Sequence, residues 1–322
     1  MVSPQISLTL TKESDVLTIR PARPDELPAL TTYADDDARN GATAAYLTGL
    51  LENGCTRADW CLVAERDGEL VGNVVLWTIP GRSVPMDVVL FEPGDDETAA
   101  ALLRHAAELA RSLGAETQGH VLDAPSQAPQ FQHDPERRVR LLTAEGFSLD
   151  RDGHRFIRSD DDPLPAQDDR LRWRSLAELG EEPFVDLLAD TFTDTKDAIF
   201  LAEVAEHGVR GAAERNLAEM RELDHEPGWF EIGYDEQDRP VAVSLPARTA
   251  SSAVIGLIAV APAGRGHGYA TAAVARGTHV LVTAGATEIR GDCDGGNVAM
   301  VKAFQRAGYR SFANRRMFSR PL

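Results

Sequence analysis

The chain reads VAPAGRGHGYA from Val260 to Ala270. The apolar run that precedes it, Ala253 to Val260, predicts a buried strand, and the proline-free run that follows, Thr271 to Thr283, predicts a helix. A strand, a glycine-rich turn and a helix together aim free backbone N–H groups and the positive end of the helix dipole at an anion. The sequence therefore predicts that this turn binds a phosphate or pyrophosphate, with Arg265 adding a positive charge.

Three phosphate-binding patterns compete for this turn. A Walker-type loop needs Gly-x-x-x-x-Gly-Lys-Ser/Thr, and neither that spacing nor the lysine is present. A dinucleotide fingerprint needs Gly-x-Gly-x-x-Gly, but the glycines fall at 264, 266 and 268, with alanine at 270. The pattern Arg-x-x-Gly-x-Ala, from Arg265 to Ala270, instead resembles the acyl-CoA loop of the GNAT superfamily of N-acyltransferases. A glycine-rich turn without a ligand is the alternative.

A second motif follows the first. Thr287 to Asp294 predicts the next strand, and Asn297 opens a short helix that closes in Gly308-Tyr309. This pattern resembles the second half of the GNAT CoA site, where the Asn and the helix flank the pantetheine arm. An Asn N-cap and a C-terminal Gly are also ordinary helix punctuation, but that does not explain both motifs at the family's separation. The C-terminal half is identified as a GNAT domain.

The resemblance implies a fold and a cosubstrate. The fold is mixed α/β, a mixed and mostly antiparallel sheet flanked by helices, and the cosubstrate is acetyl-CoA. Backbone groups of Ile258 and Val260 would pair with the pantetheine, and an amide N–H near Ala259 or Val260 would polarise the thioester carbonyl. The implied contacts are Ile258, Ala259, Val260, Arg265, Gly266, His267, Gly268, Tyr269, Ala270, Thr271, Asn297 and Phe304.

Candidates for the proton-transfer groups are less specific. In the family, a tyrosine often stands four residues before the Gly-aromatic pair and protonates the thiolate, but this chain has Phe304 there, which cannot donate a proton. Tyr309 is either a stand-in or a core residue. Asp292, Asp294 and Glu231 are candidate general bases, each with a solvated carboxylate as the alternative. If Cys293 points into the core, Asp292 and Asp294 share the opposite face.

A cluster of acids, Asp190, Asp194 and Asp197, falls in a region that covers the acceptor pocket in related folds. Such acids would attract a cationic amine, and helix capping is the alternative role.

The chain contains an internal repeat. Trp60 to Trp77 predicts a strand hairpin that Trp229 to Leu245 repeats, and Gly114-Ala115 matches Gly285-Ala286. We therefore expect two tandem GNAT folds: a degenerate domain at 1–159, an acidic, proline-containing linker at 160–169, and a CoA-binding catalytic domain at 170–322. We expect the residues before about 16 to form a loose tail or an added first strand.

The two copies differ at the phosphate loop. At a shift of 171 residues, Gly94, Asp95, Asp96 and Glu97 align with Arg265 to Gly268. The three acids would repel a pyrophosphate, or they are helix N-terminal residues that compensate the dipole. Both interpretations predict that the first domain has lost a normal CoA site. Its role is then structural, or it forms a wall of the substrate pocket.

Composition limits the partners. The net charge of −18 over 322 residues disfavours nucleic acid and anionic membranes. No apolar stretch approaches the roughly 18 residues that cross a bilayer, and three cysteines without metal spacing favour a reducing cytoplasm and no metal site.

We expect an N-acetyltransferase that acylates an amine of a small molecule through its C-terminal domain. The alternative is a CoA-binding regulatory or structural protein with little or no turnover. The oligomeric state stays open.

Overall fold

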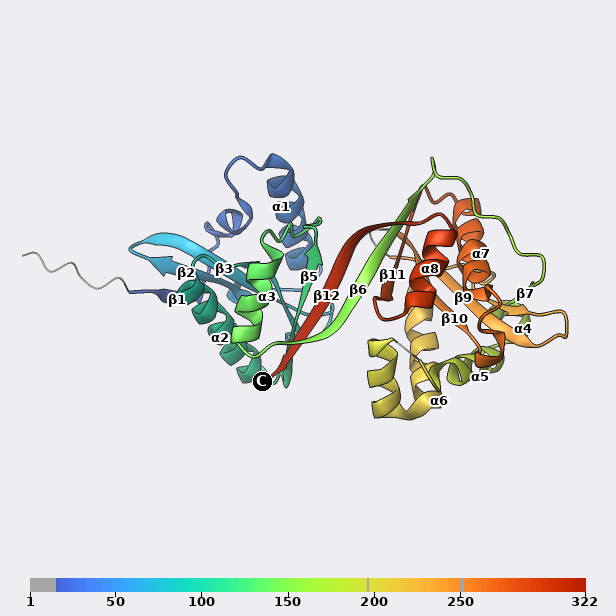
Figure 1. The fold of residues 1–322 in the computed structure, drawn as a ribbon. Helices are drawn as coiled ribbons and strands as arrows, with labels where there is room; N and C mark the ends of the chain where they lie inside the picture. Colours follow the sequence, from blue (N-terminus) through green and yellow to red (C-terminus); the bar gives the residue numbers. More distant parts are fainter. Residues whose placement is uncertain (1–15, 196, 250–251) are drawn as a thin grey trace, which may run out of the picture. The chain divides into compact units, whose positions relative to one another are not determined.

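The computed structural model describes residues 16–195, 197–249 and 252–322, so the tail predicted before residue 16 lies outside the described residues. The chain forms two compact units (Figure 1). Unit 1 comprises the residues up to His120, Ser126–Ser148 and Ser319–Leu322. Unit 2 comprises Val121–Pro125 and Leu149–Phe318.

Unit 1 begins with the first repeat of helices and strands. In chain order the elements are β1 (Thr18–Pro21), η1 (Leu27–Thr31), α1 (Asp37–Glu52), η2 (Ala58–Trp60), β2 (Cys61–Arg66), β3 (Glu69–Trp77), β4 (Asp87–Glu92), α2 (Asp96–Ser112), β5 (Thr117–Ala124), α3 (Pro135–Ala144) and β6 (Ser148–Ser159).

The sheet of unit 1 has the order β1-β2-β3-β4-β5, antiparallel except for the parallel pair β4–β5. Helix α1 covers one face, where Leu47 packs with Val63 and Val75. Helix α2 covers the other, because Gly72 lies so close to Leu102 that a Cβ would approach it to 3.1 Å. Alternation along β3 places Gly72 and Val75 on opposite faces.

The second repeat follows in the same order. Its elements are β7 (Arg172–Ser175), α4 (Leu176–Leu179), α5 (Glu182–Phe192), α6 (Ala198–Glu222), β8 (Glu231–Tyr234), β9 (Pro240–Arg248), β10 (Ala253–Val260), η3 (Pro262–Gly264), α7 (Tyr269–Thr283), β11 (Glu288–Asp294), α8 (Val298–Arg306) and β12 (Arg310–Pro321).

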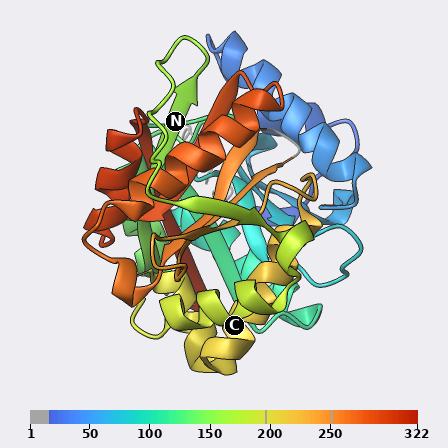
Figure 2. The same ribbon diagram turned by 90° about the vertical axis from the view of Figure 1, so that its right-hand side faces the viewer.

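The sheet of unit 2 has the order β12-β6-β11-β10-β9-β8-β7, and only β10–β11 is a parallel pair among the registers described. Helix α7 runs across its strands (Figure 2), and Ser244 of β9 donates to the carbonyl of Ala273 on that helix at 3.0 Å. Gly256 of β10 instead lies against Met220 of α6, so α6 packs on the other face.

The predicted repeat and fold class are confirmed. Each repeat contains a hairpin, a strand, a helix, a strand, a helix and a final strand, and the first of these helices, α2 or α7, makes the parallel crossover. Both sheets are mixed, mostly antiparallel and flanked by helices.

The units divide the chain differently from the predicted boundaries at 159 and 170. The structure places Leu149–Ser159, most of β6, in unit 2, where it pairs with β11 from Gly153↔Asp294 to Ser159↔Glu288. Residues 319–322 belong to unit 1. The linker composition marks a surface connection, but it carries no information about which strand the preceding segment pairs with. No described helix is both long and apolar enough to cross a membrane.

Candidate cofactor and acyl-transfer site

The parallel strands β10 and β11 separate soon after they begin. Their recorded pairs are Ala253↔Ile289 and Val254↔Arg290, and a bulge interrupts β10 between Ile255 and Leu257. Beyond that point β10 continues to pair with β9 as far as Val260↔Ala242. Within the described residues, the β10 edge that faces β11 therefore has no strand partner from Ile255 onward. This edge includes the half-buried Ile258, Ala259 and Val260.

The glycine-rich turn forms as the sequence predicts. Gly266 and Gly268 have φ values of 82° and 84°, the left-handed region that favours glycine, and Gly268 is the N-cap of α7. The backbone N–H groups from Gly266 to Ala270 find no acceptor among the described residues, since the first recorded bond of the helix is Thr271 N–H to Gly268 O. A row of unpaired donors at a helix N-terminus suits a bound anion.

The side chain of Arg265 joins two predicted sites. Its Nη1 lies 2.5 and 2.6 Å from the two carboxylate oxygens of Asp194, and its Nη2 donates to Thr191 O at 3.3 Å. Both charged groups are partly exposed, at 39% and 60%. Arg265, predicted at the phosphate, and Asp194, predicted at the acceptor, thus form one ion pair.

A neighbouring arginine was not predicted. Arg170 donates from Nη2 to His267 O at 3.1 Å, and its guanidinium lies 5.3 Å from the Tyr269 ring, on which the His267 ring stacks at 5.6 Å. Arg170 also pairs with Asp168. A basic residue at the end of an acidic segment was the only sequence signal, and no motif contains it.

The helix that follows β11 is capped as its sequence suggests. Asn297 is the N-cap of α8, and its side chain accepts from Met300 N–H at 3.2 Å. Asn297 therefore caps the helix in this structure, and its contact with a cofactor stays a prediction.

Phe304 occupies the core. It is 1% exposed, its ring stacks on Phe156 at 4.8 Å, and a Cβ at Gly291 would lie 2.6 Å from that ring. The implied cofactor contact of Phe304 does not fit this surrounding, because protein atoms already enclose the ring. Tyr309 is also core: its hydroxyl shares a 2.7 Å hydrogen bond with Thr278, and burial raises its pKa.

The three candidate bases have different environments. Glu231 is 5% exposed and both of its oxygens accept from Arg276, at 2.6 and 2.7 Å. Asp294 is 9% exposed and accepts from Gly296 N–H and Ala198 N–H, at 2.7 and 3.3 Å. Asp292 is exposed, and its oxygens accept no hydrogen bond within the described residues.

Asp292 is also well placed. Cys293 lies in the core, so Asp292 points to the opposite face of β11, just beyond the point where β10 and β11 separate. Of the three candidates, Asp292 alone has carboxylate oxygens available to a ligand in the part of the chain that the structure describes.

A charged network surrounds Asp292. The Nε of Arg155, on β6, lies 3.5 Å from Asp292 Oδ1. Asp123, on β5, accepts from Arg155 Nη1 at 2.8 Å and from two nitrogens of Arg315 at 2.8 Å each. Sequence reasoning missed this network, because Asp123 and Arg155 come from the first repeat and only the strand order brings them to β11.

The predicted acceptor acids do not gather in one site. Asp197 is 8% exposed, caps α6 through Ile199 N–H at 3.0 Å and pairs with Arg151 at 3.2 Å, which is the capping alternative. Asp194 binds Arg265, and Asp190 is exposed on α5. This arrangement therefore does not favour a single cationic ligand held by all three carboxylates.

Unit 1 closes the equivalent strand edge with its own side chains. Strands β4 and β5 also pair only briefly, at Asp87↔Gly119 and Val88↔His120. From Val88 onward, His120 Nδ1 bonds Val88 O at 2.9 Å, Gln130 accepts from Leu90 N–H at 2.9 Å, and Arg138 donates to Phe91 O. Burial lowers the pKa of His120 to about 4.

The acids of unit 1 belong to a helix rather than to a loop. Asp95 is the N-cap of α2 and accepts from Thr98 N–H at 2.8 Å, with Asp96 and Glu97 in the first turn. The predicted alignment with Arg265 to Gly268 is wrong, because residues 93–95 connect β4 to α2 whereas 261–268 connect β10 to α7. The helix-capping interpretation is confirmed, and the connection between β4 and α2 forms no comparable turn.

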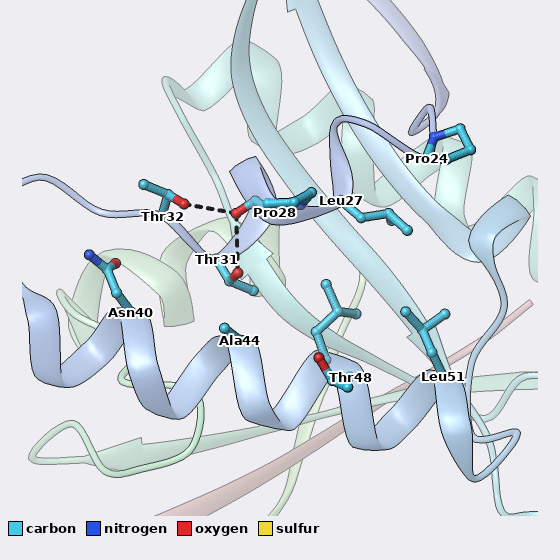
Figure 3. Close-up of a pocket in the computed structure, with 10 residues that line it drawn as sticks. Pro24, Leu27, Pro28, Thr31, Thr32, Asn40, Ala44, Thr48 and Leu51 are labelled. Carbon is cyan, nitrogen blue, oxygen red and sulfur yellow. Dashed lines mark hydrogen bonds between the residues drawn. The ribbon is translucent and has the colours of Figure 1, made fainter.

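A cavity of about 470 Å³ lies between η1 and α1 of unit 1 (Figure 3). Its lining is mainly apolar, and the hydroxyls of Thr31 and Thr32 both donate to Pro28 O. The Asn40 amide is bonded to the backbone of Tyr33. With no titratable side chain in this lining, the cavity offers no acid–base chemistry. No described group of three His, Cys, Asp or Glu residues could hold a metal ion.

Comparisons with known proteins agree with this fold. The model of the acetyltransferase (GNAT) family matches residues 171–309. A GCN5-related N-acetyltransferase from Sphaerobacter thermophilus has a similar structure, with 17% identity over 95% of both chains and a TM-score of 0.60. A tandem GNAT protein from the clavulanic acid biosynthesis pathway is similar over 95% of this chain and 98% of its own, with 16% identity and a TM-score of 0.52. No curated protein matches.

Proposed function

We propose that unit 2, whose residues 171–309 match the model of the GNAT acetyltransferase family, transfers the acetyl group of acetyl-CoA to an amine of a small molecule. The observation that carries the proposal is the contrast between two equivalent strand edges. Among the described residues, the backbone donors at the β10 edge and in the turn at Gly266–Ala270 have no partner, whereas unit 1 satisfies the same edge with His120, Gln130 and Arg138.

The residues present suit the phosphates and the pantetheine of the cosubstrate. The N–H groups from Gly266 to Ala270 would hold the pyrophosphate at the positive end of α7. Backbone groups of Ile258 and Val260 would pair with the pantetheine, and an amide near Ala259 would stabilise the negative oxygen that develops during acyl transfer. Bound acetyl-CoA supplies the thioester carbonyl that is attacked.

We assign proton acceptance to Asp292. As the amine nitrogen bonds to the acetyl carbon and the carbon–sulfur bond breaks, the amine must lose one proton and the thiolate must gain one. The carboxylate oxygens of Asp292 accept no hydrogen bond from a described residue, although Arg155 Nε lies 3.5 Å from Oδ1, whereas those of Glu231 and Asp294 are bonded to Arg276 and to backbone N–H groups. Because Phe304 is buried and has no hydroxyl, solvent protonates the thiolate.

A test uses thiol release from acetyl-CoA with a panel of small amines. Asp292→Asn should lower the rate by about 10²-fold or more, most strongly below the pKa of the amine, while acetyl-CoA still binds. Asp294→Asn is the matched control: it should lower the unfolding temperature, because it weakens two backbone contacts. An unchanged pH–rate profile in Asp292→Asn would remove Asp292 as the base.

A second candidate function has one observation in its favour. Where the family often has a tyrosine, this chain has the buried Phe304, as expected of a protein that binds CoA but has little turnover. Acetyl-CoA binding without thiol release for any amine would favour this regulatory or structural role.

A further inference from the structure

Two charged residues of opposite sign lie on the same face of β11 at the point of strand separation. Arg290 is the last β11 residue paired with β10, opposite Val254, and Asp292 follows two positions later. Alternate residues of a strand share a face and lie about 7 Å apart. An anion-binding and a cation-binding group therefore stand side by side at the proposed site of acyl transfer.

Arg290 keeps part of its guanidinium available. Its Nε donates to Glu288 at 2.7 Å, and neither Nη1 nor Nη2 makes a hydrogen bond to any described residue. The guanidinium lies 5.5 Å from the centroid of the Phe312 ring, and the side chain is 35% exposed. Two N–H-bearing nitrogens beside an aromatic ring can hold a carboxylate in a fixed orientation.

Arg155 adds a buried donor to the same place. This residue is 9% exposed, and its guanidinium lies 4.9 Å from the Phe312 centroid. Its Nη1 is bonded to Asp123, but its buried Nε makes no hydrogen bond to a described residue, with Asp292 Oδ1 3.5 Å away as an ion-pair partner. A buried N–H without an acceptor is unfavourable, so an oxygen supplied by a ligand would stabilise it.

The charges of the cluster balance. The carboxylates of Asp123, Glu288 and Asp292 face the guanidiniums of Arg155, Arg290 and Arg315. A polycation or a dianion would leave one sign in excess in this partly buried cluster, whereas a zwitterion adds one charge of each sign.

We propose that the acceptor is an amino acid, a primary amine that carries a carboxylate within about four bonds, as the roughly 7 Å spacing of the two side chains allows. The amine lies at Asp292, and the carboxylate lies at Arg290 and the Nε of Arg155, against Phe312. This inference rests on the proposed function and names the substrate class of the same site.

The test compares acceptors that differ only in the carboxylate. Alanine is paired with alaninol, and 4-aminobutanoate with 4-aminobutanol, in the thiol-release assay on the full chain. We expect a KM at least tenfold lower for the acid of one pair. Arg290→Gln should raise the KM of that acid about tenfold and leave the KM of the alcohol within twofold. Arg172→Gln is the control, because that exposed arginine of β7 pairs with Asp238 at 2.9 Å.

Direct binding separates failure of the inference from failure of the proposed function. Saturation-transfer NMR with the same four compounds should detect the acid and lose it in Arg290→Gln. If no compound releases thiol but the acid still binds through Arg290, the transferase proposal fails and the ligand class stands. If the alcohols react or bind as well as the acids, or if Arg290→Gln affects both alike, the amino acid inference is wrong. Arg290→Lys, which keeps the charge, should restore part of the binding.

Discussion

Charge reversal at Arg265 is the sharpest test of the cosubstrate site, because the structure gives this arginine a competing partner. At about 6 Å from a diphosphate, one unit charge contributes roughly 0.7 kcal/mol at a dielectric constant of 80 and 2.8 kcal/mol at 20. The guanidinium is 39% exposed, so the lower value applies. Arg265→Glu moves the charge by two units, about 1.4 kcal/mol, and should weaken acetyl-CoA binding at least tenfold.

The ion pair with Asp194 predicts an effect of opposite sign. In the ligand-free protein, the Asp194 carboxylate holds Nη1 of Arg265. Asp194→Asn removes an exposed pair, worth about 0.2–1 kcal/mol, and should strengthen acetyl-CoA binding up to about fivefold. In an Arg265→Gln background the same change should have no effect.

Calorimetry with acetyl-CoA at low and moderate salt measures these affinities and the number of sites. We expect one site per chain and effects that shrink as salt rises. Two equivalent sites would refute the contrast drawn between the units. Unchanged affinity in Arg265→Glu would show that the turn does not hold the pyrophosphate, and weaker binding in Asp194→Asn would show that Asp194 supports the loop rather than competing for it.

Three further predictions concern the stability of variants and the solubility of fragments. Phe304→Tyr should lower the free energy of unfolding by about 1–3 kcal/mol in urea titrations, because its hydroxyl enters an apolar core, and unchanged stability would place a polar partner there. The pKa of His120 is lowered in the folded chain, so its contribution to the free energy of unfolding is complete above about pH 6.5 and falls toward pH 4, by at most roughly 3 kcal/mol. His120→Gln should therefore make the urea midpoint depend less on pH between pH 7.5 and 5. An unchanged dependence on pH would contradict this. A fragment 149–318 should be more soluble than 170–322, which lacks the β6 partner of β11, and equal behaviour of the two would count against the division into units.

The local structure of the site could be predicted from the sequence. The run before Pro262 is a strand, the glycines at 266 and 268 take the left-handed conformation, and a helix follows at once. Each of these depends on neighbours in the chain, so residue type and spacing were sufficient.

The roles of the acids could not be predicted, because they depend on partners distant in sequence. Glu231 is held by Arg276 and Asp294 accepts from Ala198 N–H at the start of α6, whereas Asp292 lies beside Arg155 of β6. The position of Arg155 beside Asp292 follows from the β6–β11 register, which no local pattern encodes.

The alignment of the repeats failed at one place for a related reason. A constant shift assumes equal connections, but the connection from β4 to α2 is shorter than that from β10 to α7. Strand length and bulges, such as the one at Ile255, move the register without leaving a signal in composition.

The return of residues 319–322 to unit 1 has a consequence for how the protein is made. Arg320 is 6% exposed and donates to Leu103 O, Gln118 Oε1 and Glu145 O, at 2.6, 2.6 and 2.8 Å. A ribosome makes these residues only after all of unit 2. The half of the protein that emerges first therefore cannot complete its core until the half that emerges second has been synthesised. The nascent chain must hold an unfinished sheet edge throughout that interval, and a premature stop immediately before Arg320 would damage the N-terminal unit rather than the C-terminal one.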